Sequence, residues 1–265
     1  MNIGFIGAGN MARAIILGIC SENLMDAHSV YASNPSSEKL RNLEAECGIN
    51  TSADNKYVAE LSEVLFLCVK PQKLEDVAME IKDVIDKNAI IVSIAAGKSI
   101  KDLETMFGGE RKIVRVMPNA PALTGDGICA LSPNEAAEND ERMQEIIDLL
   151  GGIGEVVTVD EAMIDIAGQI AGASPAWISM IIEAMADGAV HEGMPRDMAY
   201  RFAAAGVTGT GRLASKLGGN PGKIKDMVSS PKGTTIEGIR ILEERGVRSA
   251  FMDAVIASCE KAKKL

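Results

Sequence analysis

The first 159 residues alternate short apolar runs with amphipathic stretches. The runs are Asn2–Ile6, Ser29–Ala32, Val64–Val69, Ala89–Ile94, Lys112–Val116, Gly127–Leu131 and Glu155–Val159. Short, nearly continuous apolar runs are typical of strands that are buried on both faces. The stretches between them repeat apolar residues at helical spacing, as in Leu74, Val77, Ala78 and Ile81, and a helix is expected over Glu135–Leu150. Strands that alternate with helices predict an α/β fold with a mostly parallel sheet.

The pattern changes from residue 160 onward, where no strand-like alternation remains. Long segments rich in Ala, Met and Ile are separated by Gly and Pro, which predicts an all-helical domain. Ser174 followed by Pro175 is typical of a helix start, with serine as the cap and proline at the first position. Small residues such as Ala205, Gly206 and Gly209 would let apolar helices pack closely. We therefore expect domains at 1–159 and 160–265, the second pairing with another copy of the chain.

A dinucleotide-binding motif lies between the first expected strand and the first expected helix. Gly7-Ala8-Gly9-Asn10-Met11-Ala12 has the form G-x-G-x-x-A. In this context the first glycine permits a tight turn, the second leaves room for a pyrophosphate, and the alanine lets helix and strand approach. The alternative is a glycine-rich turn without a ligand. The flanking strand and helix favour a Rossmann domain, with cofactor contacts from Gly7, Gly9, Asn10, Met11 and Ala12.

The second expected strand ends without the acidic residue that usually binds the ribose of NAD. It continues as Ser33-Asn34-Pro35, which offers hydroxyl and amide donors where a carboxylate would repel a 2′-phosphate. This favours NADP(H), with NAD(H) as a usable second cofactor. The alternative for Ser33 and Asn34 is ordinary turn chemistry before Pro35.

Charge and composition exclude several other classes of function. The formal net charge of −10 argues against a nucleic-acid partner, because phosphate binding needs a basic face. The five cysteines form no CxxC pair and predict reduced thiols in a cytoplasmic protein, and we expect no signal peptide. The uncharged segment from 166 to 182 is short for a membrane span and is expected to be a buried helix. Neither His28 nor His191 belongs to a cluster with metal-ligand spacing, so we expect no metal.

Several longer motifs identify a family. The chain resembles the pyrroline-5-carboxylate reductase family along nearly its whole length, and its Met-Pro-Asn and Ser-Pro-x-Gly-x-Thr segments are the most specific. The matching segments are Ile6–Ala12, Val69–Gln72, Ser93–Gly97, Arg115–Leu123, Gly193–Asp197 and Lys225–Gly238.

The resemblance implies NAD(P)H-dependent reduction of 1-pyrroline-5-carboxylate to L-proline, the last step of proline biosynthesis, by hydride transfer from nicotinamide C4 to the imine carbon. It also implies a helical C-terminal domain that interlocks two chains, with a decamer as a larger ring of such dimers. By position, the cofactor would be lined by Val69, Lys70, Pro71, Ala95, Ala96, Gly97, Met117 and Asn119. Asn55 would approach the adenine-side ribose, and Ser230, Thr234 and Thr235 would hold the substrate carboxylate.

The loop from Ser230 to Thr235 precedes a helical stretch, so it offers hydroxyls and free N–H groups at a helix start. A carboxylate fits there, and the alternative is a helix cap without a ligand. Thr235 is also a donor for the imine nitrogen or the product amine. Lys70 follows a strand and would bind the anionic substrate or the cofactor, unless it only faces solvent. Arg115 is expected to brace the turn at 117–121.

One segment and two single residues depart from the family and lie near the expected substrate pocket. The segment Ala171–Ser174 replaces the usual Ser-Gly-Ser-Gly, Gly168 replaces a threonine, and Lys232 stands where glycine is common. They leave open a reductase of another cyclic imine or small oxo acid, or a non-catalytic NADP-binding regulatory protein. The absence of lysine from 160–173 counts against the hydroxyacid enzymes on this scaffold.

Overall fold

The computed structural model describes residues 1–218 and 220–263, which form two compact units. The first unit is Met1–Gly172 with the chain end from Lys261, and the second is Ala173–Glu260. One long helix, α8 (Glu161–His191), belongs to the first unit at its start and to the second for the rest. The division of the chain at 159/160 stays a prediction.

The first unit is built on an 8-stranded sheet in the order β3-β2-β1-β4-β5-β6-β7-β8. All neighbouring strands are parallel except β6 and β7. The predicted mostly parallel α/β fold is therefore confirmed. The strands are β1 (Ile3–Ile6), β2 (Val30–Ser33), β3 (Asn50–Ser52), β4 (Val64–Leu67), β5 (Ile90–Ser93), β6 (Lys112–Met117), β7 (Gly127–Pro133) and β8 (Gly154–Thr158).

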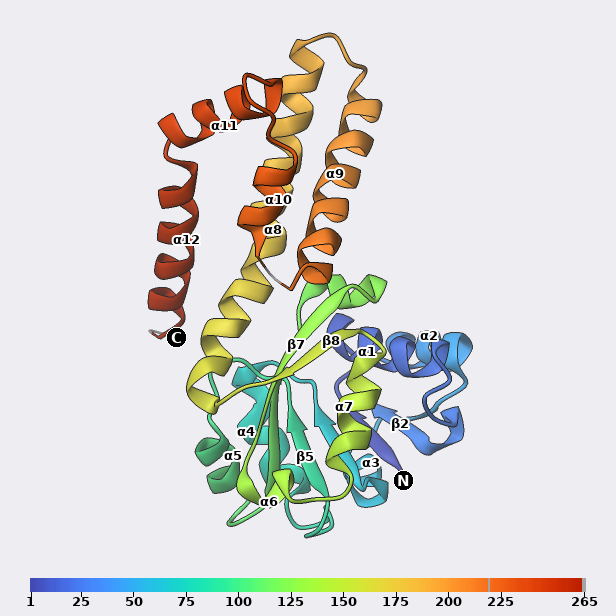
Figure 1. Ribbon diagram of the computed structural model, residues 1–265. Helices are drawn as coiled ribbons and strands as arrows, with labels where there is room; N and C mark the ends of the chain where they lie inside the picture. The colour runs from blue at the N-terminus through green and yellow to red at the C-terminus, as the bar shows by residue number, and fades with distance from the viewer. Residues whose placement is uncertain (219, 264–265) are drawn as a thin grey trace. The chain divides into compact units, whose positions relative to one another are not determined.

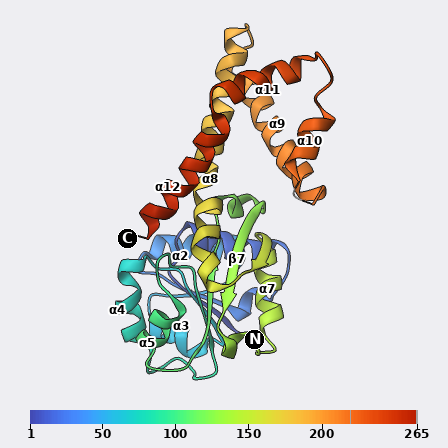
Figure 2. The ribbon, with the colours of Figure 1, turned by 60° about the vertical axis from the view of Figure 1, so that its left-hand side comes forward.

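Helices cover both faces of the sheet, so the strands have buried residues on both sides. Phe66 packs with the helices on one face, and its neighbours Leu65 and Leu67 pack on the other. The first face carries α1 (Asn10–Ser21), α2 (Ser37–Cys47) and α7 (Met143–Gly151). The second carries α3 (Asn55–Leu61), α4 (Pro71–Ile81) and α5 (Ile100–Met106). Figure 2 shows α7 on one side of the sheet and α4 and α5 on the other.

The register of the parallel strands brings their carboxyl ends to one edge. Ile6 at the end of β1 pairs with Ser33 of β2 and with Leu67 of β4, and Leu67 pairs with Ser93 of β5. The chain runs from β1 toward β2 and β3 on one side and returns to β4 on the other. Ligands bind at such a reversal of strand order, outside the carboxyl ends of the strands.

Two helices differ from the sequence-based prediction. The helix expected over 135–150 is two helices, α6 (Glu135–Glu138) and α7, because the Asp140 carboxylate accepts the backbone N–H of Arg142 at 3.0 Å and competes with helical bonds. The expected helix start at Pro175 is wrong, since α8 runs through this proline without ending. Short 3-10 helices lie at Ala27–Ser29 (η1) and Ala120–Thr124 (η2).

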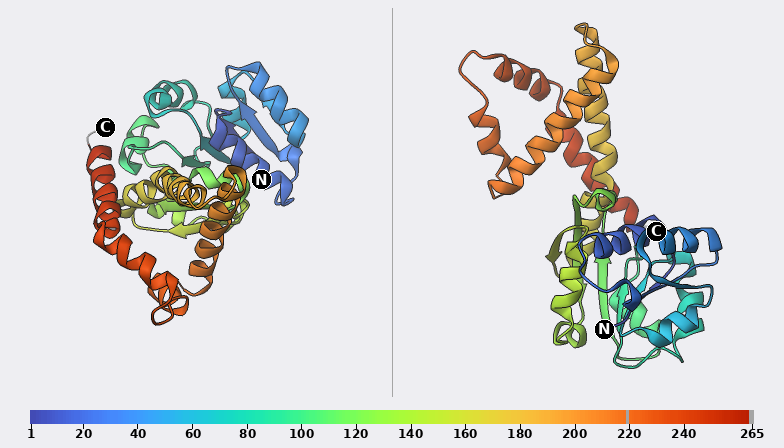
Figure 3. Two further views of the ribbon diagram at one scale, coloured as in Figure 1. Left: turned by 90° about the horizontal axis from the view of Figure 1, so that it is seen from above. Right: turned by 90° about the vertical axis from the view of Figure 1, so that its right-hand side faces the viewer.

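The second unit is all-helical over its described residues, as expected. Besides most of α8, it contains α9 (Arg196–Lys216), α10 (Pro221–Met227), α11 (Thr234–Glu244) and α12 (Val247–Ala262). Figure 3 shows these helices in an open arrangement rather than a closed bundle. Over the described residues, no helix is long and apolar enough to cross a membrane.

The second unit buries little apolar surface within itself. Its core is a small cluster around Ala186, Ala199 and Ala203. Large apolar side chains remain exposed on several helices, among them Met180 at 69% and Phe202 at 66%. A monomeric protein rarely leaves so many apolar side chains on one set of helices in water.

Candidate active site

The loop that leads from β1 into α1, which is labelled in Figure 1, has the geometry of a phosphate-binding turn. Gly7 has φ +100, and a Cβ there would lie 2.7 Å from the carbonyl oxygen of Cys68, so only glycine fits. Gly9 is the N-cap residue before α1 and has extended backbone, and a Cβ on it would meet nothing within 4 Å. Ala12 is buried between helix and sheet. None of the described side chains caps α1, which leaves its first N–H groups without a side-chain acceptor, as a phosphate site requires.

Polar side chains from β2 and α3 lie next to this loop. The Asn34 Oδ1 accepts the backbone N–H of Ala8 at 3.2 Å, which ties the end of β2 to the glycine loop. Ser33 is fully buried and donates from Oγ to Asn55 Oδ1 at 2.7 Å. Asn55 in turn donates from Nδ2 to Glu80 Oε2 of α4 at 2.9 Å, a contact that the sequence did not indicate. Ser33 therefore orients Asn55 at the start of α3.

The segments after β4 and β5 lie at the same edge of the sheet. Lys70 is exposed and directly precedes α4, with Val69 before it and Pro71 as the first helical residue. After β5, Ala95 is buried and donates its N–H to Ser93 Oγ at 3.3 Å, while Ala96 and Gly97 are exposed. The structure thus brings these predicted cofactor residues to the edge where the glycine loop lies.

The segment after β6 is held by bonds within the protein. Asn119 is 6% exposed. Its Oδ1 accepts the backbone N–H of Ile128 at 2.9 Å, and its Nδ2 donates to the carbonyl oxygen of Ala171 at 3.2 Å. Asn119 lies at the predicted edge, with both ends of its amide bonded to backbone groups of other segments.

Arg115 connects β6 to the first turns of α8. Its guanidinium is buried and donates to Glu161 Oε1 at 3.1 Å and to Asp165 Oδ1 at 2.7 Å. The Glu161 Oε1 also accepts the backbone N–H of Ile100 at 2.6 Å. The bonds of Arg115 therefore go to α8, and not to the turn at 117–121 that the sequence suggested.

The loop before α11 presents two hydroxyls at an uncapped helix start. Gly233 donates its N–H to the carbonyl of Ser230 at 3.0 Å, which closes a four-residue turn. Lys232 within this turn has φ +59, a left-handed conformation that glycine adopts more easily. Thr234 and Thr235 are exposed first residues of α11, and no described side chain caps that helix. The second unit therefore offers a site suited to a carboxylate.

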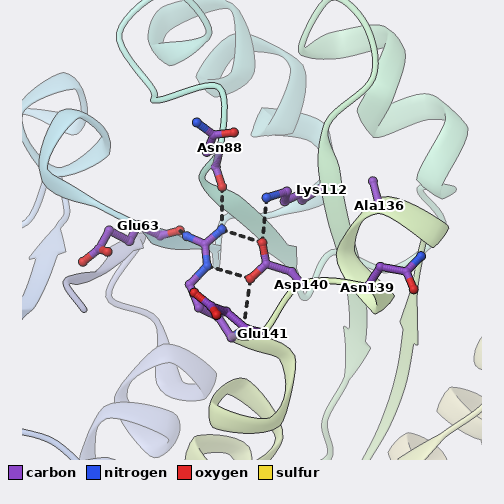
Figure 4. A pocket seen from close by; sticks show the side chains of 8 residues that line it. Glu63, Asn88, Lys112, Ala136, Asn139, Asp140 and Glu141 are labelled. Atoms are coloured by element: carbon purple, nitrogen blue, oxygen red, sulfur yellow. Dashed lines mark hydrogen bonds and ion pairs between the residues drawn. The ribbon is translucent and has the colours of Figure 1, made fainter.

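A charged hollow lies at the opposite, amino edge of the sheet (Figure 4). The Asp140 carboxylate accepts from Lys112 Nζ at 2.6 Å and from Arg142, whose guanidinium also donates to the backbone oxygens of Glu63 and Asn88 at 3.1 and 2.7 Å. The hydrogen bonds from Arg142 hold the pKa of Asp140 well below its ordinary value. These charges satisfy one another and join the α6–α7 connection to β4, β5 and β6, so the hollow is a structural clamp.

Cys47 and Cys129 offer no thiolate for catalysis. Burial raises the pKa of Cys129 to about 12 and contributes most to raising the pKa of Cys47 to the same value. A nucleophilic or redox cysteine instead has a lowered pKa. The chemistry of the site therefore depends on binding groups, hydroxyls and backbone N–H groups.

Comparison with known proteins places both units in described families. The family described as pyrroline-5-carboxylate reductase dimerisation matches residues 161–265. The family described as NADP oxidoreductase, coenzyme F420-dependent, matches residues 2–97. The Escherichia coli pyrroline-5-carboxylate reductase is 40% identical over 99% of this chain and 97% of that protein. The Arabidopsis thaliana enzyme is 35% identical over 99% of this chain and 95% of its own length.

Solved structures agree over the full length. The pyrroline-5-carboxylate reductase of Coxiella burnetii has a TM-score of 0.93 at 31% identity and covers 99% of this chain and 97% of its own. The NADP-bound pyrroline carboxylate reductase of Plasmodium falciparum has a TM-score of 0.87 at 29% identity, covering 100% and 97%.

Proposed function

The chain belongs to the pyrroline-5-carboxylate reductase family, and we propose that the carboxyl edge of its sheet binds NADP(H) while the loop before α11 binds the substrate carboxylate. It is an oxidoreductase that reduces 1-pyrroline-5-carboxylate to L-proline with NAD(P)H in proline biosynthesis. The observation that carries the residue assignment is the position of two family motifs. Each lies at a helix N-terminus that no described side chain caps.

The residues at the sheet edge fit a dinucleotide. The uncapped start of α1 and the open space beside Gly9 suit the pyrophosphate, and the neutral amide of Asn34 at the end of β2 would lie near the 2′-phosphate of NADP. Val69 to Pro71 follow β4, Ala95 to Gly97 follow β5, and Met117 is the last residue of β6, on the other side of the reversal in strand order. We assign them to the nicotinamide half of the cofactor. Lys70 is the exposed cation among them and would hold a phosphate or the substrate carboxylate.

The reaction needs little acid or base from the protein. NADPH, when bound, would supply the hydride for the imine carbon, and the ring nitrogen would take one proton from solvent. The two electrons of the hydride convert the C=N bond into CH–NH. We propose that Ser230 and Thr234 hold the carboxylate and that the Thr235 hydroxyl donates a hydrogen bond to the ring nitrogen. The protein then accelerates the reaction mainly by positioning the two reactants.

Replacing Thr235 tests this assignment. Thr235→Ala should lower kcat by roughly 10- to 100-fold, the effect of one lost hydrogen bond in the transition state, with unchanged NADPH affinity. Steady-state kinetics and NADPH titration by fluorescence measure the two quantities. Thr105→Ala is a matched control, because the Thr105 hydroxyl bonds only the Lys101 carbonyl within α5. Loss of NADPH binding in Thr235→Ala would remove this residue from the substrate loop.

The chain self-associates through its C-terminal helices, which match the dimerisation family. We propose the dimer as the unit of assembly and a decamer as a ring of such dimers. The exposed apolar side chains on α8 and α9 support the first step, because a partner would cover them. We further propose a cytoplasmic protein without nucleic-acid or membrane partners, which the net charge of −10 and the unpaired, partly or fully buried thiols support.

A reductase of another cyclic imine on the same scaffold is the second proposal, and Lys232 favours it. The exposed side chain of Lys232 adds a cation to the carboxylate loop, where glycine is common in the family. A non-catalytic NADP-binding protein has no observation in its favour here. Turnover with competing cyclic imines separates the two reductase proposals.

A further inference from the structure

One face of α8 meets alternate residues of β6 and of the segment that follows it. Residues two apart on an extended strand point to the same side, and residues three or four apart on a helix share a face. The strand residues are Arg115, Met117 and Asn119, and the helix residues are Glu161, Asp165, Gly168 and Ala171. All of these belong to the first unit.

The contact between Met117 and α8 requires a glycine at position 168. A Cβ at Gly168 would lie 2.5 Å from Cγ of Met117, closer than side-chain carbons approach. Gly168, which replaces the family's usual threonine, therefore leaves the space that the Met117 side chain occupies. This accounts for one departure from the family without a change of substrate.

The contact between Asn119 and Ala171 depends on Pro175, which lies one turn further along α8. An α-helix bonds the N–H of residue i to the carbonyl of residue i−4, and proline has no N–H. Pro175 lies inside α8, so the Ala171 carbonyl cannot receive its regular helical donor. Asn119 Nδ2 donates to this carbonyl at 3.2 Å. The side chain of Asn119 thus donates a hydrogen bond to the Ala171 carbonyl, whose regular helical donor is missing at Pro175.

The same asparagine also holds the start of β7. Its Oδ1 accepts the backbone N–H of Ile128 at 2.9 Å, so one buried amide joins the segment after β6, the start of β7 and α8. Both bonds require the asparagine side chain, because aspartate lacks the donor and leucine lacks both groups.

We propose that Asn119 is a positioning residue that holds the Met117–Asn119 segment against α8 through the Ala171 carbonyl, and so sets the geometry of hydride transfer. This rests on the proposed function, which places that segment at the nicotinamide end of the cofactor. A residue with this role affects turnover more than cofactor affinity, because the proposed function assigns most of the binding contacts to the glycine loop and the ends of β2, β4 and β5.

A double-mutant cycle on Asn119 and Pro175 tests the proposal. Asn119→Asp keeps the acceptor for Ile128 and removes the donor to Ala171. Pro175→Ala returns a backbone N–H to the helix, which can bond Ala171. We expect Asn119→Asp to lower kcat about tenfold in the wild-type chain and less than about threefold in the Pro175→Ala chain. The Kd of NADPH should change by less than about twofold in both.

Two controls keep the result interpretable. Asn139→Asp removes a similar bond, from an asparagine Nδ2 to the Glu135 carbonyl at 2.9 Å in α6, and should leave kcat unchanged. Asn119→Ala, which removes both bonds, should lower kcat at least as much as Asn119→Asp. Thermal unfolding of each variant shows whether it folds.

Equal losses of kcat with and without Pro175 would overturn the proposal, since Asn119 would then act independently of Ala171. A loss of NADPH affinity as large as the loss of kcat would also overturn it and make Asn119 a direct cofactor ligand. Failure of the proposed function looks different: the wild-type protein would not reduce 1-pyrroline-5-carboxylate. The coupling of Asn119 with Pro175 would then still be measurable in the free energies of unfolding.

Discussion

Asn34 determines which charge lies at the end of β2. Its amide oxygen accepts the Ala8 N–H, and its Nδ2 donates to the Ser36 carbonyl at 3.4 Å. A carboxylate could keep the bond to Ala8 but would repel the 2′-phosphate of NADP, whereas the free 2′-hydroxyl of NAD could donate a hydrogen bond to that carboxylate. We therefore expect the preference for NADP(H) to depend on this neutral side chain.

Asn34→Asp should reverse or weaken this preference. We expect kcat/KM with NADPH to fall at least about tenfold, while kcat/KM with NADH changes less than about threefold, because the repulsion acts on the phosphate alone. Both cofactors are measured with the same substrate preparation. An equal decline with both would show that Asn34 only supports the loop.

The backbone conformation of Lys232 could not be predicted from the sequence. The sequence marks it as a departure from the family, but its left-handed backbone is visible only in the structure. A non-glycine residue in this region carries a strain of about 1 kcal/mol. The turn therefore holds Lys232 in a conformation that the glycine common in the family adopts without this strain.

Among the elements, the connection between α6 and α7 depends most on a buried charge. The Asp140 side chain is 6% exposed and is paired with Lys112 and Arg142. Because these bonds lower the pKa of Asp140 in the folded protein, the carboxylate stabilises the fold above its unfolded pKa of about 3.9. That contribution is lost as the pH falls toward the folded pKa.

Asp140→Asn should therefore destabilise the protein in a pH-dependent way. We expect the variant to lose about 1–3 kcal/mol of unfolding free energy at neutral pH and progressively less below about pH 4, where the wild-type carboxylate starts to lose its advantage. Urea unfolding at both pH values gives the difference. Asp148→Asn is the control, since Asp148 is exposed and bonds only Gln144 in α7. A difference that stays constant with pH would contradict the account.

Elements with an apolar signal could be predicted from the sequence, and those without it could not. The buried runs of β1, β4 and β5 are present where they were expected. The strand β3 is short and polar and lies at the sheet edge, so no apolar run marks it. Pro175 was misread as a helix start, because local propensity carries no information about a bond from Asn119, which lies 52 residues from Ala171.

At the scale of the whole molecule, the candidate site was predictable as motifs but not as contacts. The glycine loop and the loop before α11 could be located from residue order, because each has a recognisable spacing. The partners of Arg115 could not, since they lie 46 and 50 residues away on α8. The pairing of Ser33 with Asn55 depends in the same way on the strand order.

What covers the exposed apolar side chains of the second unit is also a question about the whole molecule. Neither α11 nor α12 has a buried residue, although both carry apolar positions such as Leu242 and Met252 that are more than half exposed. The apolar pattern of the sequence predicts these helices, but it does not indicate what covers their exposed apolar side chains. The match of this region to a dimerisation family supports self-association of the chain.

The central claim is that this chain reduces 1-pyrroline-5-carboxylate, and the most direct measurement is NADPH oxidation by the purified protein with that substrate, with NADH in parallel. We expect rapid oxidation that depends on the substrate, with one proline formed for each NADPH consumed and a lower rate with NADH. NADPH that binds but is not oxidised, across the full range of substrate concentration, would contradict the account and direct the search to another cyclic imine or a small oxo acid.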